Sequence, residues 1–238
     1  SRRESRNGTT ISDFVKHLKF DLRDGFPLLT TKKMFLRGII EELLLFIRGE
    51  TDSKILEEKR VNIWKGNTSR EYLDFVGMTD RKEGIMGPMY GYQLRNFNAP
   101  YNEETGRATT QGIDQLANIV NLLKTNPTSR RIIMTTYNPE QVDDGVLPPC
   151  HSIVLQFYCN DGFLDTFCFN RSSDIGLGLP FNIASTSLFI LLIGKLTGLS
   201  PRYFNLSLGD AHIYENHTDS LIEQIDRKHY TFPTITLP

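Results

Sequence analysis

The chain has 238 residues, of which 39% are hydrophobic and 23% charged, a length and composition typical of a globular protein with one core. Its formal net charge is -1, which argues against a surface built to hold nucleic acid, so no nucleic-acid partner is required. No apolar run approaches the roughly 20 residues that cross a membrane and no signal segment opens the chain, so we expect a cytoplasmic protein, with a nuclear or organellar location left open.

Three segments have the pattern of helices. Residues 35–48 carry apolar side chains at helical spacing and end at Gly49, where a left-handed C-cap is expected. A second amphipathic helix is expected over residues 113–123, before Asn126-Pro127. A third is expected over residues 183–195, because Pro180 gives a helix-entry signal.

Strands are expected between these helices. Residues 132–137, 153–158 and 164–169 are rich in β-branched and aromatic residues, and Asn160-Asp161-Gly162 predicts a hairpin between the last two stretches. Helices and strands alternate irregularly, and no GxGxxG or GxxxxGK[ST] loop indicates a Rossmann or P-loop protein. We therefore predict an α+β fold, a single domain with a mixed sheet packed against helices.

The chain has three cysteines, which is too few for a disulfide framework. Their spacing does not match that of a zinc site, so no metal is expected. Cys150 differs from the other two because it follows Pro148-Pro149, which fix the backbone at the start of a predicted strand. A buried structural cysteine would fit the same position. His151 need not lie beside the Cys150 thiol, because neighbouring strand residues point to opposite faces.

Three polar clusters have side chains suited to a phosphorylated nucleoside. The clusters are Ser129-Arg130-Arg131, Asn170-Arg171-Ser172-Ser173-Asp174 and Gly209-Asp210-Ala211-His212-Ile213-Tyr214. The first two contain arginines, which bind phosphate bidentately. Each cluster also has a structural explanation. Arg130-Arg131 would fit a solvated pair, Arg171 the surface end of a strand, and His212 with Tyr214 a pair of hydrogen-bonded core residues. His212 and Tyr214, two apart on an extended segment, face the same side.

Several blocks of the sequence resemble the successive active-site blocks of the thymidylate synthase family. These are DGFPLLTTKK, EELLLFIRGET, VNIWKGN, GPMYGYQLR, SRRIIM, LPPCHS, NRSSDIGLGLPFNIAS and LGDAHIYENH, collinear from about Arg6 to Pro233. The resemblance implies a six-stranded sheet whose face packs against a second subunit in an obligate homodimer. It also implies an enzyme that methylates C5 of dUMP with 5,10-methylenetetrahydrofolate as co-substrate, giving dTMP and dihydrofolate.

The resemblance assigns the matched residues their roles. Cys150 matches the nucleophile that adds to C6 of dUMP, and Arg171 matches the cation that favours its thiolate and binds phosphate. The other catalytic positions are Asn182, which would read the uracil edge, with Tyr90, Glu42, His151 and Asp174. The nucleotide would further contact Arg6, Ser172, His212 and Tyr214, with Arg130 and Arg131 reaching across from the partner subunit. The folate side would include Ile63, Trp64, Asn67, Asp174, Gly178 and Phe181.

Some positions depart from the family pattern. Asn170 stands where the family usually has Gln, and Leu94 and Tyr137 replace customary tryptophans. The chain ends at Pro238, before family members normally do, so residues 1–238 are expected to be a thymidylate synthase domain without its C-terminal end, able to bind dUMP but slow to methylate it. A pyrimidine nucleotide hydroxymethylase, a Cys–His hydrolase and a catalytically silent dUMP-binding dimer remain alternatives.

Overall fold

The computed structural model of the chain describes residues 1–5 and 7–237. Internal contacts divide the chain into two compact units, each built from separate stretches of sequence. Unit 1 comprises Ser1–Phe35, Leu123–Ile133 and Cys150–Pro238, and unit 2 comprises Leu36–Leu122 and Met134–Pro149. The α+β class and the six-stranded mixed sheet packed against helices are confirmed, whereas the assignment of residues 1–238 to one domain stays a prediction.

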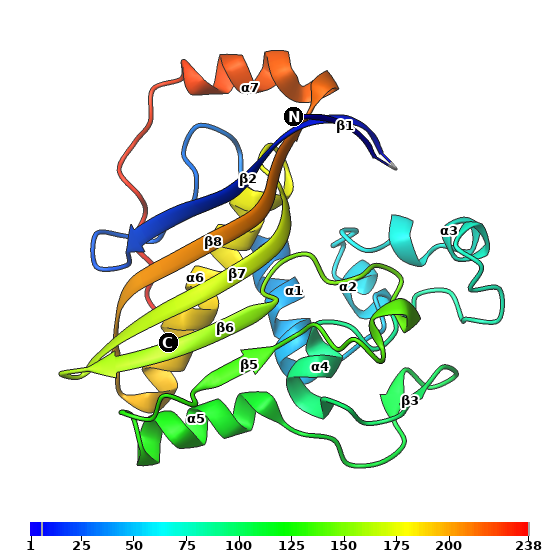
Figure 1. Cartoon of the computed structure of the whole chain (residues 1–238), viewed down its shortest axis with the longest axis horizontal. Coiled ribbons are helices and arrows are strands. Elements are labelled where there is room, and N and C mark those ends of the chain that lie inside the picture. Colours follow the sequence, from blue (N-terminus) through cyan, green and yellow to red (C-terminus); the bar gives the residue numbers. More distant parts are fainter. Residues whose placement is uncertain (6, 238) are drawn as a thin grey trace. The chain divides into compact units, whose positions relative to one another are not determined.

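The sheet is centred on four long strands of unit 1, which lie side by side in Figure 1. Its order is β1-β2-β8-β7-β6-β5, with β7 and β8 parallel and the pairs β1/β2, β2/β8 and β6/β7 antiparallel. The bounds are Arg2–Ser5 for β1, Gly8–Asp21 for β2, Ile133–Thr135 for β5, Val154–Asn160 for β6, Phe163–Asp174 for β7 and Ser200–Tyr214 for β8.

The predicted hairpin between β6 and β7 is confirmed. Asp161 and Gly162 have φ angles of 50° and 78°, the left-handed conformation that a two-residue hairpin turn with the sheet's twist requires. Cys159 pairs with Leu164 and Cys168 pairs with Leu155, so both cysteines are hairpin residues, as predicted. The strand β7 runs on to Asp174, beyond the predicted end at 169, because its polar second half pairs with β8.

Helix α6 (Gly178–Thr197) covers one face of the sheet, where it packs against β7 and β8. The Phe157 ring of β6 meets the Phe189 ring of α6 with centroids 6.4 Å apart. The helix starts before the predicted residue 183 because its first turn includes Pro180, which needs no backbone N–H there. By length and composition α6 could also cross a membrane, but 61% of its most apolar stretch is buried inside the protein, as in a core helix.

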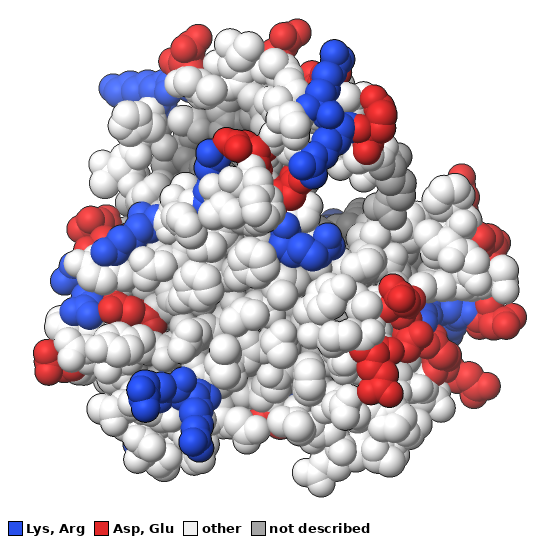
Figure 2. All heavy atoms as spheres, in the orientation of Figure 1, with Lys and Arg blue, Asp and Glu red and all other residues white. Residues whose placement is uncertain are grey.

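The opposite face of the sheet is not covered by α6. Figure 2 shows that the area over β6, β7 and β8 carries few charged side chains, which lie mostly around its margins. Tyr158 and Phe167, on this face, are 62% and 40% exposed. Unit 1 also contains η3 (Glu215–His217) and α7 (Thr218–Ile225).

Unit 2 is mainly helical. Helix α1 confirms the predicted first helix, and Gly91 of α4 approaches it so closely that a Cβ there would lie 2.7 Å from Phe46 Cα. The predicted helix over 113–123 is α5, which begins and ends two residues later. The bounds are Leu36–Arg48 for α1, Lys54–Glu58 for α2, Gly66–Thr68 for η1, Arg70–Phe75 for α3, Gly91–Asn96 for α4, Tyr101–Asn102 for β3, Arg107–Ala108 for β4, Gln115–Thr125 for α5 and Val142–Asp144 for η2.

Candidate functional site

The turn that carries Cys150 is fixed to strand β7. The backbone N–H of Ser172 donates to the Cys150 carbonyl at 3.2 Å, and the N–H of Ile153 donates to the Phe169 carbonyl at 2.9 Å. Between them, Ser152 adopts a left-handed backbone with φ of 51°. The thiol of Cys150 is half-buried, so a reactive group is presented on a turn that the sheet holds in place.

Strand β7, to which this turn is bonded at Ser172, carries three predicted site residues. Arg171 is exposed, while Ser172 and Asp174 are half-buried. Asp174 is held by the backbone that follows it, because its Oδ1 accepts the N–H groups of Gly176 at 2.9 Å and of Leu177 at 3.1 Å. A cation and a carboxylate therefore lie on the strand to which the cysteine turn is bonded.

Strand β8 adds an oriented imidazole to the same edge. His212 lies opposite Asp174 in the register of the two strands. Its Nδ1 is 3.0 Å from Asp210 Oδ1, and Asp210 Oδ2 also accepts from the Arg3 guanidinium at 3.2 Å. The Tyr214 ring stands edge-on to His212 with centroids 5.7 Å apart, which places the predicted sugar-binding pair together.

Asp210 is a further candidate site residue, to which the sequence assigned no role. By holding Nδ1 of His212, it leaves Nε2 as the nitrogen directed at other partners. A signal was present, because Asp210 and His212 are two residues apart on a strand and therefore share a face.

The start of α6 brings Asn182 close to Asp174. A Cβ atom at Gly178 would lie 3.9 Å from both Asn182 Oδ1 and Asp174 Cβ. Gly178 therefore leaves space between an amide and a carboxylate, and Phe181, half-buried in the same turn of helix, stands next to Asn182.

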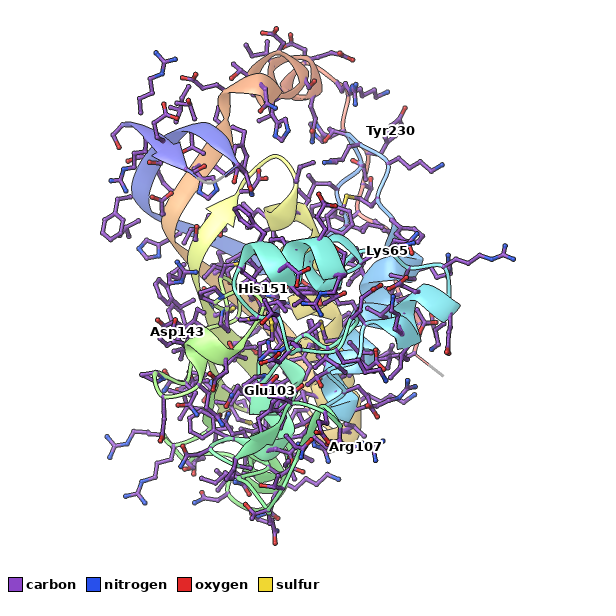
Figure 3. All side chains as sticks on the ribbon, turned by 90° about the vertical axis from the view of Figure 1, so that its right-hand side faces the viewer. Lys65, Glu103, Arg107, Asp143, His151 and Tyr230 are labelled. Carbon is purple, nitrogen blue, oxygen red and sulfur yellow. The ribbon has the colours of Figure 1, made fainter. Side chains whose placement is uncertain are left out.

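His151 follows the nucleophile candidate in the chain, and its place in unit 1 can be followed in Figure 3. Burial lowers the pKa of His151 to about 4, so the imidazole is neutral at pH 7. Its Nδ1 lies 3.3 Å from the Ser152 hydroxyl. A neutral ring at this place can relay a hydrogen bond but supplies no positive charge to the Cys150 thiol.

A second cluster of predicted residues lies within unit 2. Trp64 Nε1 donates to Glu42 Oε1 at 2.8 Å, and burial raises the pKa of Glu42 to about 7 although that hydrogen bond opposes the change. The Tyr90 ring is 6.0 Å from Trp64 and 5.1 Å from Phe46. Glu42, Trp64 and Tyr90, separated in sequence, thus come together around a carboxyl group that changes charge near neutral pH.

The Tyr90 backbone is strained, with φ of 37° and ψ of -96° at the entry to α4. Such conformations in a bulky residue persist where the surrounding structure fixes them, often at functional sites. The other two predicted folate-side residues of unit 2 flank Trp64. Ile63 is 40% exposed and Asn67 is half-buried in η1.

The remaining predicted arginines are not brought to the Cys150 turn. Arg130 and Arg131 are exposed and precede Ile132, whose carbonyl accepts from the Phe157 N–H. Phe157 pairs with Thr166, toward the start of β7 and away from Arg171. Arg6 lies outside the described residues.

No group of three or more His, Cys, Asp or Glu side chains in the described part of the chain is arranged to hold a metal ion. Cys150, Cys159 and Cys168 form no disulfide with one another.

Comparison with known proteins decides the family. A family profile described as thymidylate synthase matches residues 1–238. The chain belongs to the thymidylate synthase family. It is 48% identical over 237 residues to thymidylate synthase 1/2 of Encephalitozoon cuniculi, covering 99% of this chain and 80% of that protein.

Two further relatives are bifunctional proteins. The chain is 47% identical over 236 residues to bifunctional dihydrofolate reductase-thymidylate synthase 2 of Arabidopsis thaliana, covering 99% of this chain and 42% of that protein. It is 48% identical over 238 residues to bifunctional dihydrofolate reductase-thymidylate synthase of Plasmodium chabaudi, covering 100% of this chain and 41% of that protein. The chain thus spans about two fifths of the length of these two bifunctional relatives.

Proposed function

We propose that this chain is the thymidylate synthase catalyst that methylates C5 of dUMP, with 5,10-methylenetetrahydrofolate as co-substrate, and releases dTMP and dihydrofolate. One observation carries the proposal. The Cys150 turn is hydrogen-bonded to β7 at Ser172, so the proposed nucleophile lies on a turn bonded to the strand that carries the proposed phosphate ligands Arg171 and Ser172. The family match over residues 1–238 supports the same reaction.

The residues of unit 1 divide the work on the nucleotide. The Cys150 thiolate adds to C6 of the pyrimidine, which makes C5 nucleophilic, and Arg171 favours the thiolate and binds the phosphate. The Asn182 amide offers one donor and one acceptor, as O4 and N3–H of uracil require. His212, oriented by Asp210, and Tyr214 hold the sugar hydroxyl.

The folate side is assigned to Ile63, Trp64 and Asn67 of unit 2 and to Asp174, Gly178 and Phe181 of unit 1. The folate supplies the one-carbon unit and the hydride. Within unit 2, Ile63 is 40% exposed, as a side chain that contacts a ligand requires. Glu42, with a pKa of about 7, can hold or release a proton near neutral pH, which is the property of a general acid or base.

We propose also that the sheet face not covered by α6 is the homodimer interface. It carries few charges in Figure 2, and Tyr158 and Phe167 expose large rings on it. A hollow of about 320 Å³ lies between Lys19, Phe167 and Ser207 on the same face. Side chains of the partner subunit would fill it in the proposed dimer. Arg130 and Arg131, remote from the Cys150 turn, would serve the partner subunit's nucleotide.

A cytoplasmic location stays a prediction from the sequence. A hydroxymethylase of the same superfamily would pass the one-carbon unit to water, often on cytosine. Asn182 argues against the cytosine version, because an acidic side chain would suit the cytosine amino group.

The decisive test is dihydrofolate formation from dUMP and methylenetetrahydrofolate, followed by absorbance, with product analysis to separate dTMP from a hydroxymethyl nucleotide. We expect turnover by the chain and its loss in Cys150→Ser, with the dUMP dissociation constant changed by less than about tenfold, because the arginines and Asn182 supply the binding. Cys159→Ser is the control and should keep activity. Turnover by Cys150→Ser would refute the nucleophile assignment.

A further inference from the structure

Asn170 lies beneath the turn that carries Cys150 and has no part in the proposed reaction. Its side chain is on β7, one residue before Arg171, and the residue is 1% exposed. Its Oδ1 accepts the Ser152 N–H at 2.9 Å, and its Nδ2 lies 3.5 Å from the Ser173 hydroxyl. Because both ends of this buried amide are engaged, its orientation is fixed.

The turn above Asn170 needs support. Ser152 has φ of 51°, a conformation that costs a non-glycine residue on the order of 1 kcal/mol and persists where neighbouring contacts hold it. The bonds from Ser172 N–H to Cys150 and from Ile153 N–H to Phe169 are backbone bonds. The bond from Ser152 comes to a side chain, so it is a support that a substitution can remove.

Cys168 reinforces the same oxygen. Its Sγ lies 3.7 Å from Asn170 Oδ1, and the residue is 0% exposed. Burial raises the pKa of Cys168 to about 12, so the thiol keeps its proton and can donate it. Asn170 Oδ1 thus accepts from two donors, the Ser152 backbone N–H and the Cys168 thiol of β7.

We propose that Asn170 is a positioning residue whose amide oxygen holds Ser152 in its left-handed conformation and thereby fixes the direction of the Cys150 thiol. The inference rests on the proposed function, in which Cys150 must meet C6 of the nucleotide. A reacting group displaced by about 1 Å slows a reaction by roughly 100-fold. Asn170 would therefore control the rate of the reaction rather than the binding of dUMP.

The experiment measures both quantities in the full chain carrying Asn170→Ala. Single-turnover methylation should fall by roughly 10- to 100-fold, while the dUMP dissociation constant should change by less than about threefold, since no nucleotide ligand is removed. Ser173→Ala removes only the longer contact of Asn170 and should keep the rate within about twofold. Asn170→Gln restores an amide acceptor and should recover the rate to within about tenfold of the original.

Amide hydrogen exchange of Ser152, read by NMR, tests the bond without any turnover. Slow exchange is expected in the original chain, with exchange at least about tenfold faster in Asn170→Ala. If the original chain did not methylate dUMP, the proposed function would fail, whereas the exchange rate would still report on the bond. Fast exchange of Ser152 in the original chain, an unchanged methylation rate in folded Asn170→Ala, or Asn170→Gln as slow as the alanine variant would each overturn the proposal.

Discussion

Two half-buried titratable side chains of the candidate site respond to pH in opposite directions. Glu42 has a pKa raised from 4.5 to about 7, so it binds a proton more tightly in the folded state, and its burial destabilises the fold increasingly as pH rises from 4.5 to 7. His151 has a pKa lowered from 6.5 to about 4, so its contribution to stability is complete above pH 6.5 and is lost as pH falls toward 4. Between about pH 4.5 and 6.5 the two effects offset each other.

In Glu42→Gln the stability should therefore depend on pH in a range where, in the original chain, the effects of Glu42 and His151 cancel. Without the glutamate, the free energy of unfolding should rise by up to about 3 kcal/mol between pH 4 and pH 6.5, as His151 loses its proton in the unfolded state. Urea unfolding at several pH values measures this. Glu104→Gln makes the same chemical change at an exposed site and should leave the original profile. A free energy of unfolding that falls between pH 4 and pH 6.5 in Glu42→Gln would contradict the lowered pKa of His151.

Asn182 is expected to set the choice of base. In Asn182→Asp the ratio of kcat/KM for dUMP to that for dCMP should shift toward dCMP by about tenfold or more, because a carboxyl group exchanges the amide donor for an acceptor. Asn118→Asp, an exposed change on α5, is the control. An unchanged ratio in Asn182→Asp would mean that another residue reads the base.

The parallel pair β7/β8 depends on a close approach of two backbones at the site. A Cβ atom at Gly209 would lie 2.7 Å from the Arg171 carbonyl oxygen, closer than carbon and oxygen can pack. The absence of a side chain at Gly209 therefore lets β7 bring Arg171 beside β8, the strand that carries the proposed nucleotide ligands His212 and Tyr214.

Gly209→Ala should push the two strands apart, lowering the free energy of unfolding by about 1–3 kcal/mol and weakening dUMP binding together with stability. Thermal unfolding and calorimetry with dUMP measure the two effects. Gly66→Ala is the matched control, because a Cβ at Gly66 meets nothing within 4 Å, and it should be neutral or slightly stabilising. Equal behaviour of the two variants would show that the sheet yields at Gly209.

The sequence predicted those helices and turns that are determined by the residues within them. Helix α1 and the Asn160-Asp161-Gly162 hairpin follow from apolar spacing and from turn residues with positive φ. Apart from the extended segment of His212 and Tyr214, strand β8 was not predicted, because Gly209 and Asp210 are residues typical of loops and become strand only through pairing with β2 and β7. Pairing partners far apart in sequence leave no local signal.

The candidate site shows the same division. The prolines before Cys150 and the polar neighbours of Arg171 made these residues candidates, and the family resemblance gave them their expected roles. The bond from Trp64 to Glu42 and the support of Ser152 by Asn170 join residues far apart in the chain, and neither contact could be found by periodicity.

At the scale of the whole molecule, the open face of the sheet should control assembly. Phe167→Asp places a charge in the middle of the proposed interface and should convert a dimer to a monomer, because an unpaired charge is costly to bury. Light scattering after size-exclusion chromatography measures the mass. Phe75→Asp makes the same substitution at a phenylalanine of α3 that is 75% exposed and should leave the mass unchanged. A dimer that persists in Phe167→Asp would place the interface elsewhere.

The position of β8 between β2 and β7 also governs how the protein can be made. A ribosome completes β2 before β8, yet β8 is the strand that joins β2 to β7. At about 5–20 residues per second, the edge of β2 waits on the order of 10 to 40 seconds for its neighbour. Throughout that interval β2 exposes the unpaired backbone groups that later bond to β8, so the nascent chain should depend on chaperones that shield β strands until Tyr214 has emerged.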